Sequence, residues 1–384
     1  MITPSYRYQE ANGGALGIFE FSLIQHEFSG RAEFGYRMSR RAALRVGTEV
    51  GAGTSIIDAR APSFPAGSGL GSTGVENVGR IEHPYANPAI YATASIGLGD
   101  RFVLYPGARL QYNAITINRA AFDPRLRFSW QVADRTQLKG GVGQFSQTPE
   151  ITQFNDVWGN PNLGIERSLH TSFGVAQELD YGVDVEVTGF YKYVWDRVTS
   201  SDNLVVRDDR LWVENFANQG TGHIYGAELL VRKALTRRLF GWLSYTYIRS
   251  LVRQQPGRSL TPFDFDQPHI LTLLAVYKLP RNWQIGGRFR LVSGNPNTPR
   301  TSGVFNAESG EYLPLDGERN SERLPAFHQL DVRVDKRWVL RRALITGYLD
   351  IQNLYNRQNI EAWNYSYNFR QRVGTAGLPI IPSL

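Results

Sequence analysis

Hydrophobic and polar side chains alternate along most of this chain in runs of roughly ten residues, the pattern of β-strands. The clearest run extends from Val183 to Asp196. Valine, glycine, tyrosine and tryptophan occupy its odd positions, and Asp184, Glu186 and Lys192 stand among the residues between them. Because successive side chains of a strand point to opposite faces, one face of this strand is apolar and the other is largely charged.

Runs of this kind predict about fifteen strands. They cover residues 19–23, 26–38, 44–50, 88–98, 102–112, 125–132, 138–145, 169–179, 183–196, 225–232, 240–248, 270–279, 283–291, 328–335 and 345–351. Long loops are expected at residues 54–80, 146–167, 199–220, 293–323 and 355–374. Tight turns rich in glycine, asparagine, aspartate and arginine separate the other runs.

Short turns and long loops alternate along the chain, and this asymmetry favours an antiparallel transmembrane β-barrel. Such barrels have tight periplasmic turns and long extracellular loops, with the apolar face of each strand against lipid. A soluble two-layer β-protein is the alternative, in which a second protein layer covers the apolar face. A fold of that kind gives no reason for short turns and long loops to alternate along the chain.

Charged residues recur on the second face of the strands, and a dry core could not bury all of them unpaired. We therefore predict that they line a wet or plugged lumen. The residues concerned are Arg125, Arg127, Asp184, Glu186, Arg288, Arg290, Asp331, Arg333 and Asp335.

Composition agrees with a barrel and excludes several other classes. The 384 residues are 42% hydrophobic and 12% aromatic, and no stretch reaches the roughly 18 to 20 apolar residues of a transmembrane helix. Aromatic residues suit the girdles at membrane interfaces. The absence of cysteine excludes disulfides and thiol chemistry. The net charge is +7, but the basic residues form no single stripe, so no nucleic-acid partner is expected.

From about Phe145 onward the chain resembles the C-terminal barrel of TonB-dependent outer-membrane receptors. The matching stretches occur in order at residues 160–168 (NPNLGIERS), 226–235, 241–250, 265–279, 288–299, 324–338, 348–359 and 377–384 (GLPIIPSL). The resemblance implies that residues 1–384 are part of one such barrel, without a plug domain. About fifteen strands would be present of the roughly 22 in the family barrel, and the last strand would follow Pro382. No signal peptide, TonB box or plug is visible, so we expect a barrel that is not transport-competent by itself.

The resemblance implies a role in uptake of a scarce, bulky solute such as a metal chelate, a vitamin or an oligosaccharide. It also implies the bacterial outer membrane as the location and membrane lipid and the TonB complex as partners. A passive pore or structural barrel is the main alternative, and an outer-membrane hydrolase is a further one. We expect no enzyme activity, cofactor or metal, because no His, Ser or acidic residues show catalytic or metal-ligand spacing.

Aromatic residues in or beside the long loops are candidate ligand contacts. These are Phe154, Trp158, Trp195, Trp212 and Phe216, which could equally belong to a girdle or to loop packing. The sequence Gly69–Gly74 fits the pattern G-x-G-x-x-G, but it stands in a loop rich in Ser, Gly and Pro rather than between a strand and a helix. We therefore interpret it as a flexible loop. His269 and His328 are interpreted as strand-end residues at an interface.

Overall fold

A computed structural model describes residues 2–15, 19–62, 75–155, 159–207, 209–235, 238–307 and 310–384. Nearly all regular structure in these residues is β-strand, apart from two single 3₁₀ turns, η1 (Asp180–Gly182) and η2 (Pro280–Asn282). The strands of the main sheet are β1 (Ile2–Ala15), β2 (Phe19–Arg37), β3 (Ala42–Pro62), β4 (Val75–Leu98), β5 (Phe102–Tyr112), β6 (Ala120–Ala133), β7 (Thr136–Gln147), β8 (Glu166–Leu179), β9 (Val183–Arg207), β10 (Arg210–Lys233), β11 (Leu239–Arg253), β12 (Thr261–Pro262), β13 (His269–Leu279), β14 (Trp283–Val292), β19 (Phe327–Val339), β20 (Leu344–Gln352) and β23 (Ile381–Ser383).

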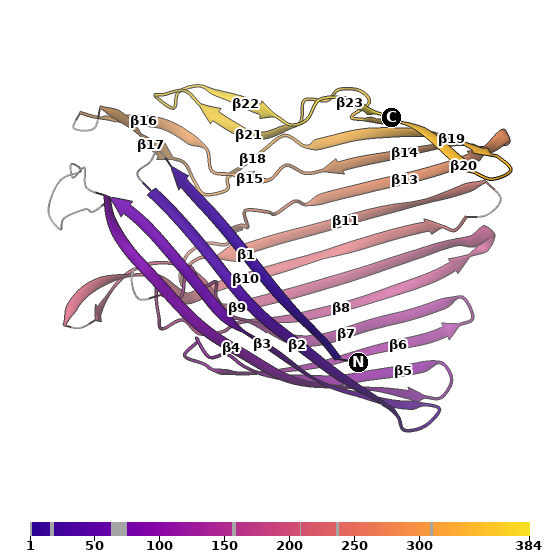
Figure 1. Ribbon diagram of the computed structural model, residues 1–384, viewed down its shortest axis with the longest axis horizontal. Helices are drawn as coiled ribbons and strands as arrows, with labels where there is room; N and C mark the ends of the chain where they lie inside the picture. Colours follow the sequence, from indigo (N-terminus) through magenta and orange to yellow (C-terminus); the bar gives the residue numbers. More distant parts are fainter. Residues whose placement is uncertain are drawn as a thin grey trace.

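In the described residues the main sheet has 17 strands, and all of its strand pairs are antiparallel; β11 pairs with both β12 and β13, and β14 pairs with β19. It curls round on itself, so that β1 to β4 pass in front of the middle strands in Figure 1. Among the described residues, β1 pairs only with β2, and β20 pairs with β19 and β23. The sheet is therefore a partial barrel with an open seam between its first and last strands, which confirms the predicted fold class.

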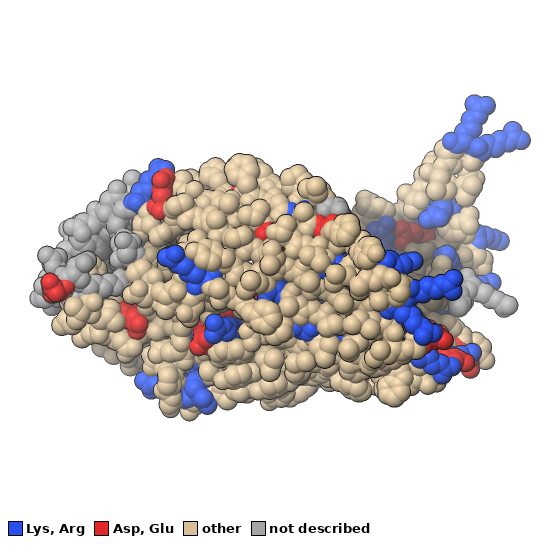
Figure 2. Space-filling view, turned by 90° about the horizontal axis from the view of Figure 1, so that it is seen from below, with Lys and Arg blue, Asp and Glu red and all other residues tan. Residues whose placement is uncertain are grey.

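The alternation in the sequence sorts side chains onto the two faces of this sheet. On β13, Leu271, Leu273 and Ala275 share one face, while Thr272 and Leu274 lie on the other beside Arg290 and Arg288 of β14. We call the face of Leu273 the outer face and the face of Arg288 the inner face. Uncharged residues cover most of the wall in Figure 2, with a few charged residues scattered between its two ends, as expected for a surface that meets lipid.

The two ends of the sheet differ in their connections. At one end, which we call the tight-turn end, the strands are joined by a few residues, as at η1 and η2. Tyr181 and Arg281 take positive φ values of 59° in these turns, and Gly99 takes 75° in another. Many of the exposed Lys and Arg residues in Figure 2 lie at this end. The opposite, long-loop end carries the extended connections.

The long connections contain structure of their own. Residues 293–326 include β15 (Pro296–Asn297), β16 (Arg300–Asn306), β17 (Glu311–Asp316) and β18 (Glu322–Arg323), which form two separate two-stranded sheets. A third small sheet pairs β21 (Ile360–Tyr365) with β22 (Arg372–Ala376). No helix in the described part of the chain is long and apolar enough to span a membrane.

Several predicted strand and loop boundaries are wrong. Residues 19–23 and 26–38 form one strand, β2, and residues 2–15 form a strand that was not predicted. The predicted loops at 54–80 and 199–220 consist largely of extensions of β3, β4, β9 and β10. At these extensions the strands continue past the apolar band, so water reaches both faces and the alternation that identifies a strand is lost. Residues 69–74 lie outside the described residues.

Candidate ligand-binding wall

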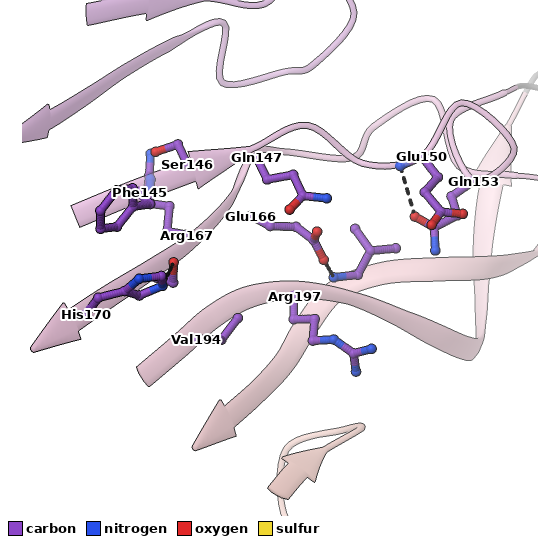
Figure 3. A pocket seen from close by; sticks show the side chains of 12 residues that line it. Phe145, Ser146, Gln147, Glu150, Gln153, Glu166, Arg167, His170, Val194 and Arg197 are labelled. Atoms are coloured by element: carbon purple, nitrogen blue, oxygen red, sulfur yellow. Dashed lines mark hydrogen bonds between the residues drawn. The ribbon is translucent and has the colours of Figure 1, made fainter. Parts of the chain in front are cut away.

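A cavity of about 470 Å³ opens on the inner face near the long-loop end, between β7, β8, β9 and the connection that follows β7. Figure 3 shows Glu150, Glu166, Arg167, His170 and Arg197 around it. The Glu166 carboxylate accepts a hydrogen bond of 2.6 Å from the Val198 backbone N–H, which joins β8 to β9 at the rim. The lining is predominantly polar and of mixed charge, so this outer cavity suits a hydrated solute.

A second cavity of about 480 Å³ lies deeper on the same face, and Phe145 and His170 line both. Its charged lining residues are all cationic: Arg125 and Arg127 from β6, and Lys192 from β9. Among the described residues, none of these three cations forms an ion pair. The Nε atom of Arg125 is buried and has no hydrogen-bond partner there. A low-dielectric wall with unpaired positive charge attracts anions.

Each of the three cations lies over an aromatic ring on the same wall. Arg125 lies 5.2 Å from the ring centre of Phe145, and Arg127 lies 5.4 Å from that of Tyr105. Lys192 lies 5.8 Å from the ring centre of Phe190. The rings hold the cations in place without neutralising them, because a cation–π contact leaves the charge in place. The wall therefore presents positive charge and aromatic surface together.

The other charged residues predicted on this face are on it in the structure, and most pair with a neighbouring strand. Asp184 bonds Arg232 of β10, Glu186 pairs with Lys139 of β7 at 2.5 Å, and Arg288 of β14 bonds Asp331 of β19. Arg333 bonds Asp335 two residues along its own strand and lies 4.0 Å from the ring centre of Tyr348. Arg290 lies over the ring of Phe327. Arg290 thus keeps its charge, whereas the ion pairs brace the wall and leave little free charge for a solute.

The predicted loop aromatics do not converge on one place. Phe154 packs edge-on against His83 of β4, with 5.9 Å between the ring centres. This contact holds the connection after β7 over the inner face. Trp195 stacks on Tyr193 at 5.7 Å, on the outer face. Trp212 is 41% exposed on the extended β9–β10 hairpin.

Phe216 makes no ring contact within the described residues. Phe216 accepts a hydrogen bond from Asn160 at its backbone oxygen. Trp158 lies outside the described residues. Tyr105, Phe145 and Phe190 could not be predicted as site residues, because only the strand register shows that they adjoin the cations.

Two long connections are joined by a charged contact at the long-loop end. Asp264 accepts hydrogen bonds from Arg319 at 3.1 Å and from Asn320 at 2.7 Å. Burial alone would raise the pKa of Asp264, but the Asn320 hydrogen bond and the Arg319 charge outweigh it and lower the pKa below its ordinary value of 3.8. The ionised carboxylate thus helps to hold the connection after β11 against the one after β14.

No group of His, Cys, Asp or Glu in the described residues has the arrangement of a metal site. A solute on this wall would therefore meet guanidinium groups, an ammonium group, aromatic rings and hydroxyl groups. That set of groups binds and orients a ligand.

Residues 3–354 match the family model described as TonB dependent receptor-like, beta-barrel. No curated protein gives a significant match.

Several solved structures share the fold. The outer membrane transporter YddB from Escherichia coli is 15% identical with a TM-score of 0.62, over 89% of this chain and 52% of its own. The siderophore receptor PirA from Acinetobacter baumannii is 14% identical with a TM-score of 0.63, over 88% and 51%. The ferric citrate transporter FecA is 18% identical with a TM-score of 0.65, over 99% and 56%. The chain spans about half the length of these proteins.

Proposed function

Because the chain belongs to the TonB-dependent receptor β-barrel family, we propose that it forms part of the barrel wall of an outer-membrane uptake receptor for a bulky anionic solute. In this arrangement the outer face meets membrane lipid, the tight turns face the periplasm and the long loops face outside. Uptake would be energised through the TonB complex, as the family name implies. The proposed class of solute is an anionic metal chelate rather than a neutral oligosaccharide or a cationic vitamin.

The observation that carries this proposal is the patch formed by Arg125, Arg127 and Lys192. Three unpaired cations on one wall cost electrostatic self-repulsion, which a bound anion would relieve. Carboxylate and catecholate oxygens accept hydrogen bonds from guanidinium groups in bidentate geometry, and planar ligands stack on aromatic rings. The ferric citrate transporter and siderophore receptor among the similar structures carry names that agree with such a solute.

A binding experiment tests the solute class. Ferric citrate serves as the anionic probe, and maltoheptaose serves as a neutral probe of comparable bulk. The triple variant R125Q/R127Q/K192Q should bind ferric citrate at least tenfold more weakly than the unchanged protein in calorimetric titration. Each lost charge-assisted contact contributes roughly 0.5–1 kcal/mol at such a solvated site.

The matched control is the substitution K139Q on the same face. Lys139 is already paired with Glu186, so its loss should leave ferric citrate binding within twofold. Equal binding by the triple variant and the unchanged protein would overturn the anionic assignment, as would tighter binding of maltoheptaose.

A further inference from the structure

The outer face carries a repeated arrangement of tyrosine and histidine near the long-loop end. Two tyrosines stand two residues apart on one strand, and a histidine stands opposite the second of them on the next strand. We call this arrangement a Tyr–His set. In the part of the chain that the structure describes it occurs three times, as Tyr6, Tyr8 and His26; Tyr191, Tyr193 and His223; and Tyr245, Tyr247 and His269. Its recurrence on separate strand pairs indicates a common role.

The three sets share the same contacts. In the last set, the Tyr245 hydroxyl lies 2.8 Å from Nδ1 of His269, and the ring of Tyr247 lies 5.5 Å from the imidazole. The corresponding hydroxyl-to-Nδ1 distances are 2.8 Å at His26 and 2.7 Å at His223. The ring centres of Tyr8 and His26 lie 5.2 Å apart, and those of Tyr193 and His223 lie 5.1 Å apart. Each imidazole is thus held in a fixed orientation by one tyrosine while a second covers it.

The position of the sets matches the outer boundary of the membrane. His269 is the first residue of β13, and Leu271 and Leu273 follow it on the same face. At the other end of this apolar band stand Trp283 and Trp338, both outward and almost half exposed. Tryptophan and tyrosine mark the two interfaces of a membrane barrel. The histidines therefore lie at the depth of the headgroups in the outer leaflet.

Each histidine keeps one ring nitrogen for a ligand. Nδ1 is occupied by the tyrosine hydroxyl, and within the described residues no protein group hydrogen-bonds Nε2 of His223 or His269. When the tyrosine hydroxyl donates to Nδ1, the neutral imidazole carries its proton on Nε2. That N–H is a donor suited to a phosphate oxygen.

Arginines distinguish the second and third sets from the first. Arg249 and Arg253 of β11 are on the outer face, diagonal to His223 across the β10–β11 pair. Arg249 is also diagonal to His269, because Tyr247 is the residue opposite His269 and Arg249 follows Tyr247 by two positions on β11. Diagonal neighbours of this kind lie roughly 7–8 Å apart, within reach of long side chains.

The charge near these arginines is not fully balanced. Asp266, whose side chain is fully buried, is the acidic partner of Arg249, and it also pairs with Arg323. One carboxylate shared by two guanidinium groups leaves a surplus positive charge. Arg253 donates to the Arg258 backbone oxygen and forms no ion pair among the described residues. In the first set Glu10 takes the equivalent place, two residues beyond Tyr8, and accepts hydrogen bonds from Tyr8 and Asn12.

We propose that His223, Arg249, Arg253 and His269 form a binding surface for the phosphate groups of an outer-leaflet lipid. Arg249 lies diagonal to both histidines, so the two Nε2 atoms and the guanidinium groups supply donors along one stretch of the wall rather than around a single anion, while Tyr193 and Tyr247 cover the imidazoles at the interface. The apolar band below the site receives the acyl chains. The first set, with Glu10 beside it, repels a phosphate and serves only as part of the girdle.

Lipid binding to the purified protein in detergent tests this site. The probes are bis-phosphorylated lipid A, phosphatidylcholine and inorganic phosphate, and native mass spectrometry measures bound lipid. The variant H223F/R253Q/H269F keeps the aromatic rings but removes the donors, and should bind lipid A at least tenfold more weakly. Phosphatidylcholine binding should change less than twofold, and inorganic phosphate at millimolar concentration should not displace lipid A.

The matched control is H26F, which makes the same change in the set beside Glu10 and should leave lipid A binding within twofold. The single variant R253Q removes one partly exposed guanidinium and should weaken binding about threefold, so a folding defect in the triple variant does not decide the outcome. Unchanged lipid A binding in R253Q and the triple variant would overturn the proposal. Equal losses in H26F and the triple variant would also overturn it, because they would indicate a girdle without phosphate selectivity.

Discussion

Replacing Asp331 by asparagine should show how much one buried ion pair contributes to the stability of this wall. The carboxylate of Asp331 is 9% exposed and accepts hydrogen bonds from Arg288 at 2.6 and 2.9 Å, from Gln329 at 2.6 Å and from the Asn353 backbone at 2.9 Å. These contacts join β14 and β19 to the end of β20. A hydrogen bond to a charged group contributes about 1.5–3 kcal/mol. Asparagine keeps one acceptor oxygen, and water resolvates the half-exposed Arg288, so the net loss should be about 2 kcal/mol.

Urea-induced unfolding from phospholipid vesicles, followed by tryptophan fluorescence, measures this loss. The matched control is Asp184→Asn, because Asp184 accepts the same pair of hydrogen bonds from Arg232, at 3.1 and 2.7 Å. That pair is more exposed, at 36% and 62%, so the control should lose less than about 1 kcal/mol. Equal losses in the two variants would refute the argument that burial sets the strength of these pairs.

Three further predictions concern other parts of the molecule. Leu273→Arg on the outer face should destabilise the protein in vesicles by about 2–4 kcal/mol, whereas Leu274→Arg on the inner face should cost less than half as much in the same urea titration. Gly226→Ala would place a Cβ atom 2.0 Å from the Tyr247 backbone oxygen, so overpacking should lower the free energy of unfolding by about 1–3 kcal/mol. The control Gly189→Ala, whose Cβ atom would have its nearest neighbour at 4.0 Å, should lose little stability. Equal losses of stability in the two variants would contradict the strand spacing. The depressed pKa of Asp264 means that the contact between its two connections stabilises them above pH 3.8 and weakens as the pH falls through the lower folded pKa. Proteolysis of these connections with pepsin should therefore accelerate below about pH 4. Asp264→Asn should be cleaved faster than the unchanged protein where Asp264 is ionised, and the two rates should converge below the folded pKa of Asp264.

The regularly alternating strands could be predicted from the sequence almost to the residue. The run at 270–279 corresponds to β13 (His269–Leu279), because lipid on one side and water on the other require alternation along its whole length. β1 was missed because Pro4 resembles a strand breaker and Glu10 stands on the otherwise apolar side of the run. The extended hairpin of β9 and β10 was interpreted as a loop because its outer part has water on both faces.

The charged wall could be predicted in outline, but its binding patch could not. Alternation places Arg125 and Arg127 on the inner face, and it cannot show which charges find partners on other strands. Phe145 meets Arg125 only because residues far apart in the sequence come into register on β6 and β7. The Tyr–His sets were missed for the same reason, since their members belong to different strands. Only His269 and His328 were interpreted as interfacial, from their positions at strand ends.

The assignment of lipid to the outer face is tested most directly by spin labels placed one at a time along β13. The sequence contains no cysteine, so a single cysteine introduced at each position from 270 to 277 carries the label without background. In vesicles, labels at 271, 273, 275 and 277 should be relaxed by oxygen dissolved in lipid, and labels at 270, 272, 274 and 276 by a water-soluble nickel chelate. Outer positions shielded from both reagents would show that protein covers that face, and would contradict the membrane barrel.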